Sequence, residues 1–169
     1  MNFAIKETAE LLRLKLLLGL VTVQDVVTWA DSIIESEATP DWEIIEVSLA
    51  RTVKVDEMMK LLTDIKGNCV RAQVFRRLFQ TWLIGLSEDT LQGKTIARQL
   101  YMLADELKEC GFGSAAYALD DAFDLIEFGY CTHEQALQQL QGYLQEFAES
   151  EISDPAAHPI HPELKRAPP

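Results

Sequence analysis

Long apolar runs and a secretory signal are both missing from this sequence. Apolar runs such as those at residues 16–18 and 20–21 are far too short to cross a bilayer. A signal peptide would need an unbroken apolar region near the N-terminus, where Lys6, Glu7 and Glu10 instead carry charges. We therefore expect a cytoplasmic protein that does not act at a membrane.

Cysteine is scarce as well, which limits the covalent and metal chemistry open to the chain. The three cysteines, Cys69, Cys110 and Cys131, form neither a CxxC pair nor a Cys/His ligand spacing. Free cysteine commonly packs as a small hydrophobic side chain, so we expect buried thiols. A disulfide or a metal site is the alternative that the spacing leaves open.

Motifs for nucleotide binding and nucleophilic catalysis are absent. The sequence contains neither GxxxxGK nor GxGxxG. Its three histidines, His133, His158 and His161, have no serine, cysteine or aspartate partner at a motif spacing. The sequence therefore predicts a protein that is not an enzyme and holds no cofactor.

Acidic residues, by contrast, are abundant and unevenly distributed. The 169 residues carry a net charge of -12. Residues 1–50 hold nine acids against three bases, and residues 99–152 hold eleven against one, whereas residues 51–98 hold five acids against nine bases. Such a chain should repel nucleic acid and attract a basic protein. Alternatively, the basic middle segment neutralises its acidic neighbours inside the fold.

Apolar residues recur at helical spacing along most of the chain. In residues 70–86, eight apolar side chains fall on one broad face, as expected of a central core helix. We expect an all-α fold, an irregular antiparallel bundle of about eight helices with the three tryptophans in its core. The expected helices span roughly residues 3–18, 23–35, 40–49, 57–66, 70–86, 90–110, 114–128 and 133–149.

The prolines indicate where the folded part ends. Five of the six prolines lie in the last segment of the chain, where apolar residues are too few to form a core. We expect one helical domain over residues 1–151 and a disordered, proline-rich tail over residues 152–169.

Two segments carry the same signals for the end of one helix and the start of the next. Gly19 is placed to end a helix and Thr22 to cap the following one, with Asp25 as its capping-box partner. Residues 129–135 repeat this order, with Thr132 as the cap. Shared helix-turn-helix chemistry explains the similarity better than a repeat, because two copies so far apart do not make a solenoid.

Two other helix starts are predicted from single residues. Thr39 is placed as an N-cap before Pro40, which suits the first helical position. Asp56 is expected to cap the helix over residues 57–66.

The sharpest candidate site is a group of carboxylates on the helix expected over residues 114–128. Asp120, Asp124 and Glu127 fall at i, i+4 and i+7, so they form one acidic stripe with Asp121 beside it. Such a stripe has three interpretations: a solvated helix face, a docking surface for a cationic partner, or the magnesium site of a phosphohydrolase.

A second group of carboxylates lies on the preceding expected helix. Asp105, Glu106 and Glu109 could face the stripe, as paired carboxylates do in helical pyrophosphohydrolases. Those enzymes need a regular Glu-x-x-Glu and a matching Glu-x-x-Asp. Glu106 and Glu109 have the first spacing, but the second occurs only at residues 151–154, where the expected tail begins. The sequence therefore favours a solvated or docking surface without a metal site.

Two segments resemble a known kind of protein. LGLVT at residues 18–22 leads into VVTWAD at residues 26–31, and LDDAFDL at residues 119–125 is followed by Gly129-Tyr130 and a capped helix. Together they resemble small all-helical bacterial immunity proteins of contact-dependent or polymorphic toxin systems. The resemblance implies a cytosolic protein that plugs the active site of a cognate toxin, often a basic nuclease. It brings no catalytic motif.

Charge and resemblance together lead to one hypothesis. We expect a non-enzymatic acidic protein that binds and neutralises a basic toxin, because an acidic surface speeds the capture of a cationic partner. The residues expected to contact the partner are Asp120, Asp121, Asp124, Glu127, Asp105 and Glu109. A helical adaptor or structural protein, whose acidic face serves solubility, is the alternative.

Overall fold

The computed structural model describes residues 3–88, 91–112 and 115–149. Over these ranges the chain forms nine α-helices and no strand, which confirms the expected all-α bundle. The helices are α1 (Phe3–Leu17), α2 (Val23–Ser36), α3 (Trp42–Leu49), α4 (Val55–Asp64), α5 (Arg71–Ser87), α6 (Gly93–Met102), α7 (Ala104–Glu109), α8 (Ala115–Asp124) and α9 (His133–Glu149). None of these helices is both long enough and apolar enough to span a membrane. The tail expected over residues 152–169 lies outside the described residues.

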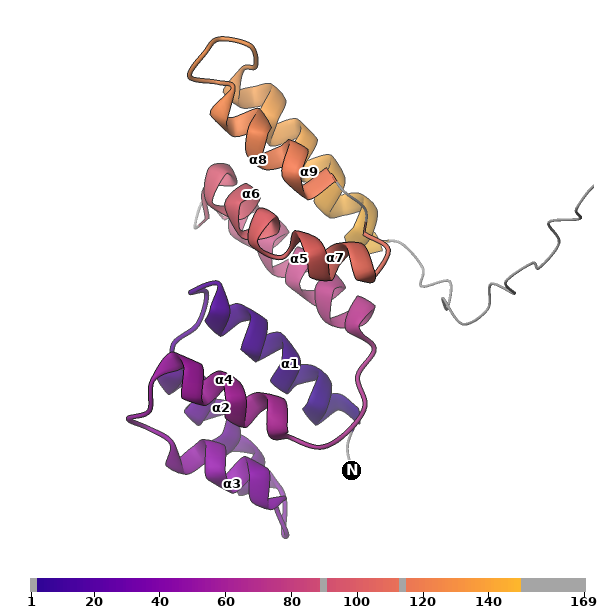
Figure 1. The fold of residues 1–169 in the computed structure, drawn as a ribbon. Coiled ribbons are helices and arrows are strands. Elements are labelled where there is room, and N and C mark those ends of the chain that lie inside the picture. The colour runs from indigo at the N-terminus through magenta and orange to yellow at the C-terminus, as the bar shows by residue number, and fades with distance from the viewer. Residues whose placement is uncertain (1–2, 89–90, 113–114, 150–169) are drawn as a thin grey trace, which may run out of the picture.

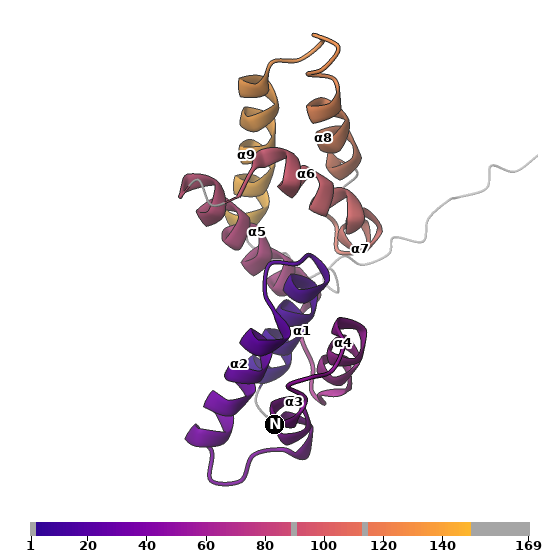
Figure 2. The ribbon, with the colours of Figure 1, turned by 90° about the vertical axis from the view of Figure 1, so that its left-hand side faces the viewer.

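The helices gather in two groups that meet where α1 packs against α5. Helices α1–α4 form the lower group and α5–α9 the upper group in Figure 1, and Figure 2 shows the same division from the side. Each group encloses its own cluster of buried apolar side chains. Leu11 and Leu14 of α1 belong to the upper cluster, whereas Ala9 and Leu16 belong to the lower one. Helix α1 therefore lies between two cores and is buried on both sides.

Helix α5 is the central helix of the upper group, as its apolar face predicted. Its large buried side chains are Val74, Phe75, Leu78, Phe79 and Trp82. The Phe79 ring centroid lies 5.2 Å from that of Phe112 and 6.0 Å from that of Tyr143, so residues from three segments share one aromatic cluster. Each such side chain contributes about 1.5–3 kcal/mol when it is fully buried. This cluster holds α9 against α5.

A buried glutamine joins α6 to both α1 and α5. Gln99 Nε2 donates a hydrogen bond to the Leu18 carbonyl oxygen over 2.9 Å, and Trp82 Nε1 donates to Gln99 Oε1 over 2.8 Å. Both bonds are buried, so none of these groups could bond to water instead. Gln99 thus fixes the C-terminal turn of α1 against the upper group.

The helix ends expected around Gly19 and Thr22 are confirmed. Gly19 has a φ of 69°, and the Leu20 N–H donates to the Lys15 carbonyl over 2.8 Å, which is the hydrogen bond of a Schellman motif. Thr22 Oγ1 accepts from the Asp25 N–H over 3.3 Å, and the Asp25 carboxylate accepts from the Thr22 N–H over 2.7 Å. These paired bonds form the predicted capping box of α2.

The second segment with these signals folds in the same way. Gly129 has a φ of 74°, and the Tyr130 N–H donates to the Leu125 carbonyl over 3.2 Å. The Thr132 N–H donates to Gln135 Oε1 over 2.9 Å, and the Gln135 N–H donates to Thr132 Oγ1 over 3.2 Å. Local capping chemistry alone therefore reproduces this turn at both places in the chain.

The helix expected over residues 90–110 is divided into α6 and α7. At Leu103 the backbone turns out of the helix, with φ −100° and ψ 5°, while its N–H still donates to the carbonyls of Gln99 and Leu100. Leu103 and Leu107 are both buried, so the bend keeps the apolar sides of the two short helices in the upper core. Apolar residues keep their helical spacing across Leu103, so the sequence pattern does not reveal that the helix is divided there.

Two helices begin at different residues from those expected. The N-cap of α3 is Asp41 and not Thr39, so Pro40 lies outside the helix. The N-cap of α4 is Lys54, which places Asp56 within the first turn. Both predictions relied on a single residue type, and a helix can begin without a side-chain cap when its apolar face is packed.

Only the side of α3 that faces α2 and α4 is buried. Ile44 and Val47 pack into the lower core, whereas Trp42 and Leu49 are 63% and 73% exposed. The expectation that every tryptophan lies in the core is therefore wrong for Trp42.

Replacing Gly93 with alanine should destabilise the fold by about 1–3 kcal/mol. The added Cβ would lie 2.4 Å from Leu137 Cδ2 and 2.8 Å from Phe123 Cζ, and Phe123 is buried. Chemical denaturation of the full chain measures the change. Gly142→Ala in α9 is the control, because nothing lies within 4 Å of its added Cβ. It should stabilise the fold by up to about 1 kcal/mol through helix propensity. A Gly93→Ala protein as stable as its parent would contradict the close packing of α6.

Gln99→Met should cost about 2–4 kcal/mol, because it leaves the Trp82 N–H and the Leu18 carbonyl buried without partners. Methionine has a similar length, so little of the loss should come from a cavity. Gln141→Met on the exposed side of α9 is the control and should change the free energy of unfolding by less than about 0.5 kcal/mol. Similar effects at the two positions would show that the buried bonds do not matter.

Candidate functional site

Helices α6 and α8 pack side by side in opposite directions, and polar side chains pair along their contact. Lys94 Nζ lies 3.1 Å from Asp124 Oδ1, and Arg98 NH1 lies 2.9 Å from Asp120 Oδ2. From the first pair to the second, the residue number rises by four on α6 and falls by four on α8, as expected for antiparallel helices. The acidic stripe predicted on α8 is therefore matched by a basic stripe on α6, which the sequence analysis did not identify.

This pairing makes the carboxylates of the stripe unequal. Asp120 is only 7% exposed and its carboxylate is engaged by Arg98. Lys94 is shared between Asp124 and Glu127, whose Oε1 lies 3.8 Å away, and its hydrogen bond to Asp124 raises the pKa of the Lys94 ammonium. Asp121 is exposed, and no ion pair links it to another described residue. Among the described residues, Asp121 is therefore the carboxylate of this stripe that has no cationic partner.

The line of pairs ends in two tyrosines. Tyr101 of α6 and Tyr117 of α8 meet edge to face with their ring centroids 5.2 Å apart. The Arg98 guanidinium carbon lies 4.9 Å from the Tyr101 ring centroid, which is within the range of a cation–π contact. Tyr117 Oη donates to the Asp105 carboxylate over 3.2 Å, and this bond raises the pKa of Tyr117. Asp105 thus belongs to the same surface as the stripe.

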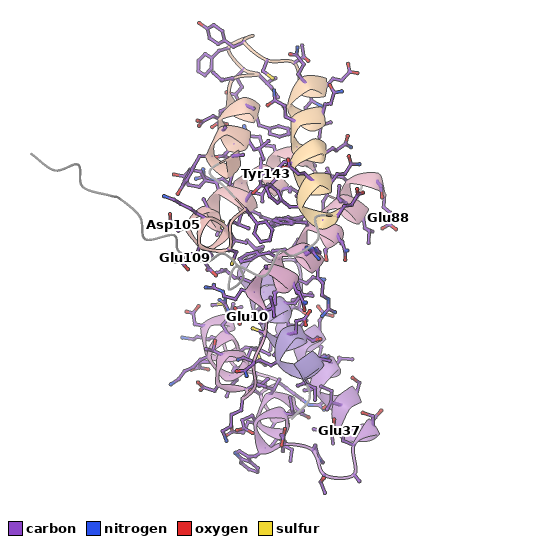
Figure 3. All side chains as sticks on the ribbon, turned by 90° about the vertical axis from the view of Figure 1, so that its right-hand side faces the viewer. Glu10, Glu37, Glu88, Asp105, Glu109 and Tyr143 are labelled. Carbon is purple, nitrogen blue, oxygen red and sulfur yellow. The ribbon has the colours of Figure 1, made fainter. Side chains whose placement is uncertain are left out.

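Glu109 belongs to a different group of charges. Its carboxylate lies 3.5 Å from Arg71 NH1 at the start of α5, and Arg71 also pairs with Glu106. Glu106 lies 3.7 Å from Arg13 of α1, so these charges link the two groups of helices. Figure 3 shows Asp105 and Glu109 on the same side of the molecule. The six residues expected to bind a partner are therefore divided between the α6–α8 contact and the α5–α7 contact.

The α8–α9 turn exposes large apolar side chains next to the stripe. Helix α8 ends at Asp124 and not near Phe128 as expected, because residues 127–129 form i to i+3 backbone bonds before the turn at Gly129. Phe128 is 73% exposed and Tyr130 is 81% exposed. The loop forms the top of the molecule in Figure 1. Glu127 therefore lies in this turn, beyond the end of the helix.

The exposed residues of this region form what we call the α8 surface. Its apolar members are Tyr101, Met102, Tyr117, Leu125, Phe128 and Tyr130. Its acidic members are Asp105, Asp121, Asp124 and Glu127. The spacing of the acidic members along the sequence predicts a shared surface. The apolar members give no such signal, because exposed and buried aromatic residues look alike in a sequence.

A shallow groove runs along the line of charged pairs. It encloses about 520 Å³ and is lined by Lys94, Thr95, Arg98, Gln99, Asp120 and Asp124. Its charged side chains are already paired with one another. Across residues 3–88, 91–112 and 115–149, no three or more His, Cys, Asp or Glu side chains are grouped so that they could hold a metal ion.

The cysteines are free thiols in the structure, as expected, but they are not fully buried. All three are half-buried and unpaired with one another. Burial raises the pKa of the Cys69 and Cys110 thiols, so both are protonated at neutral pH.

Arg98→Met should cost about 1–2 kcal/mol, because it leaves the Asp120 carboxylate buried without its cation. Lys94→Met is the matched control. Its ion pair with Asp124 is exposed on both sides, so its loss should cost less than about 0.5 kcal/mol. Chemical denaturation at neutral pH compares the two variants. Equal losses would mean that burial of Asp120 does not distinguish the two pairs.

Known proteins provide no template for this surface. The chain matches no protein-family model, no curated protein and no solved structure.

Proposed function

We propose that this is a non-enzymatic binding protein that captures a basic protein partner through the α8 surface. The observation that carries the proposal is the combination of six exposed large apolar side chains with four carboxylates along α8, the adjoining ends of α6 and α7, and the α8–α9 turn. Isolated exposed apolar residues are ordinary on soluble proteins, whereas a gathered set marks an interaction surface. The acidic residues around this set specify the charge of the partner.

The apolar members are of the types that contribute most to protein interfaces. Tyrosine, methionine and arginine are enriched there, and aromatic side chains dominate the residues whose truncation costs the most affinity. The rings of Tyr101 and Tyr117 contact each other. Arg98 packs against the Tyr101 ring, and Asp105 accepts a hydrogen bond from Tyr117. Side chains that are already ordered lose less entropy on binding, so this part of the surface is preorganised.

The charge of the surrounding helices supports a basic partner. Residues 115–149, which include α8 and α9, contain seven acids and neither lysine nor arginine. Such a field accelerates encounter with a cationic protein and repels nucleic acid and anionic lipid. Association should therefore be fast at low ionic strength and fall as salt screens the charges.

The resemblance to immunity proteins supports a toxin as the partner. In this proposal the protein acts in the cytosol, and the α8 surface covers the basic active site of a toxin, such as a nuclease. A helical adaptor would use the same surface for a partner that has no toxic activity. A metal-dependent phosphohydrolase would need Asp120, Asp124 and Glu127 as ligands, but Arg98 and Lys94 occupy them.

The first experiment is a pull-down from the source cell with the full chain at low and high salt, followed by mass spectrometry. We expect one basic protein that high salt releases. If that protein is toxic when expressed alone and harmless with this chain, the immunity role is supported. If it is harmless alone, the adaptor alternative is favoured. Recovery of acidic or neutral proteins only would contradict the proposal.

With the captured partner, Asp121→Lys should slow association several-fold and flatten its dependence on salt, because it reverses an exposed charge of the surface. Phe128→Ser should instead speed dissociation, since it removes apolar contact area. Stopped-flow mixing measures both rates. Glu88→Lys is the control, because it makes the same change of net charge. Glu88 lies on the opposite side of the molecule from Asp105 (Figure 3). This control should have a clearly smaller effect than Asp121→Lys. Equal slowing by both charge variants would place the interface elsewhere.

A further inference from the structure

A second exposed apolar surface lies on α3, in the lower group of helices. Trp42, Glu46 and Leu49 fall at i, i+4 and i+7, so they share one side of the helix. Trp42 is 63% exposed and Leu49 is 73% exposed. We call these three residues the α3 face. Figure 1 places α3 and α8 at opposite ends of the molecule, so this face is separate from the α8 surface.

The packing of α3 does not require these side chains. Ile44, Val47 and Ser48 are its buried residues, and α3 packs with them against α2 and α4. Ser48 Oγ donates a hydrogen bond to the Asp31 carboxylate of α2, so the polar side chain on the buried side of α3 has a partner. A tryptophan and a leucine on the opposite side add nothing to the core. They do leave a large apolar area in contact with water.

The segment that contains α2 and α3 is acidic. Residues 23–50 contain seven acids and neither lysine nor arginine. Two of these acids pair with bases from later in the chain: Asp31 lies 3.2 Å from Arg51, and Glu43 lies 2.6 Å from Lys66. Glu35, Asp41 and Glu46 are exposed and form no ion pair with other described residues. Glu46 lies on the α3 face between the two apolar side chains, and Asp41 directly precedes Trp42.

We infer that the α3 face docks a basic amphipathic segment of a partner protein. Apolar side chains of that segment cover Trp42 and Leu49, and its lysines or arginines pair with the bordering carboxylates such as Glu46. Charge complementarity selects this occupant. A second copy of the chain would bring the same carboxylates together, and anionic lipid or nucleic acid would be repelled. The inference does not rest on the α8 surface, so either can fail alone.

Tryptophan fluorescence can test this inference on the full chain. Trp82 is fully buried and Trp29 is half-buried, so acrylamide quenches mainly Trp42. The probe is a synthetic amphipathic helix of leucine and lysine, about 14 residues long. It should shift the emission to shorter wavelength and reduce acrylamide quenching about twofold, because it removes Trp42 from water. Two control peptides, one with glutamate for lysine and one with serine for leucine, should do neither.

Two charge variants locate the docking site. Glu46→Lys should weaken peptide binding about tenfold, because it reverses the carboxylate between Trp42 and Leu49. Glu88→Lys makes the same change of net charge in the upper group of helices and should weaken binding by less than about twofold. Circular dichroism confirms that both variants are folded. Leu49→Ser, which leaves the charge unchanged, should also weaken binding.

Several outcomes would overturn the inference. If the control peptide with serine for leucine protected Trp42 equally well, the protection would come from general attraction between opposite charges and not from apolar contact. Equal weakening by Glu46→Lys and Glu88→Lys would remove the α3 face from the site. A blue shift that grows with protein concentration in the absence of peptide, together with a dimer in sedimentation, would assign the face to a second copy of the chain.

Discussion

The structure depends on the double burial of α1. Its leucines at positions 11 and 14 pack into the upper core, while Ala9 and Leu16 pack into the lower core. A helix buried on two sides has little room for polar residues, and a charge near its cores is costly unless it is paired. Glu10 and Arg13 form such a pair, because Arg13 donates from Nε and NH2 to the Glu10 carboxylate. Burial raises the pKa of Glu10, but the bonds and charge of Arg13 outweigh it and lower the pKa overall.

Ion pairs then connect the parts of the chain that the apolar clusters bring together. Several basic residues of positions 51–98 pair with acids from the segments on either side, as Arg51 does with Asp31 and Arg98 with Asp120. Neutralisation within the fold therefore explains part of the charge distribution. Part of the acidic excess is neutralised inside the fold, and part remains exposed on the α8 surface and around the α3 face.

The sequence could predict whatever depends on neighbouring residues. The face of α5 follows from apolar spacing, and the turns at Gly19 and Gly129 follow from capping chemistry within a few residues. Pairing between distant helices leaves no local signal, so the burial of Asp120 under Arg98 could not be anticipated. The exposure of Trp42 was missed for a related reason. It depends on which side of α3 packs against α2 and α4, and that contact leaves no signal within the helix itself.

The two exposed surfaces share a property that stability alone does not explain. An unpaired acidic excess destabilises a compact protein through repulsion between like charges, and exposed apolar area adds nothing to the folded state. A chain selected for stability alone would place lysine among its carboxylates and polar residues in place of Phe128 or Trp42. Here both unfavourable features coincide, at the α8 surface and again at the α3 face. A cationic partner with apolar side chains relieves both at once, and this coincidence is the physical argument for binding.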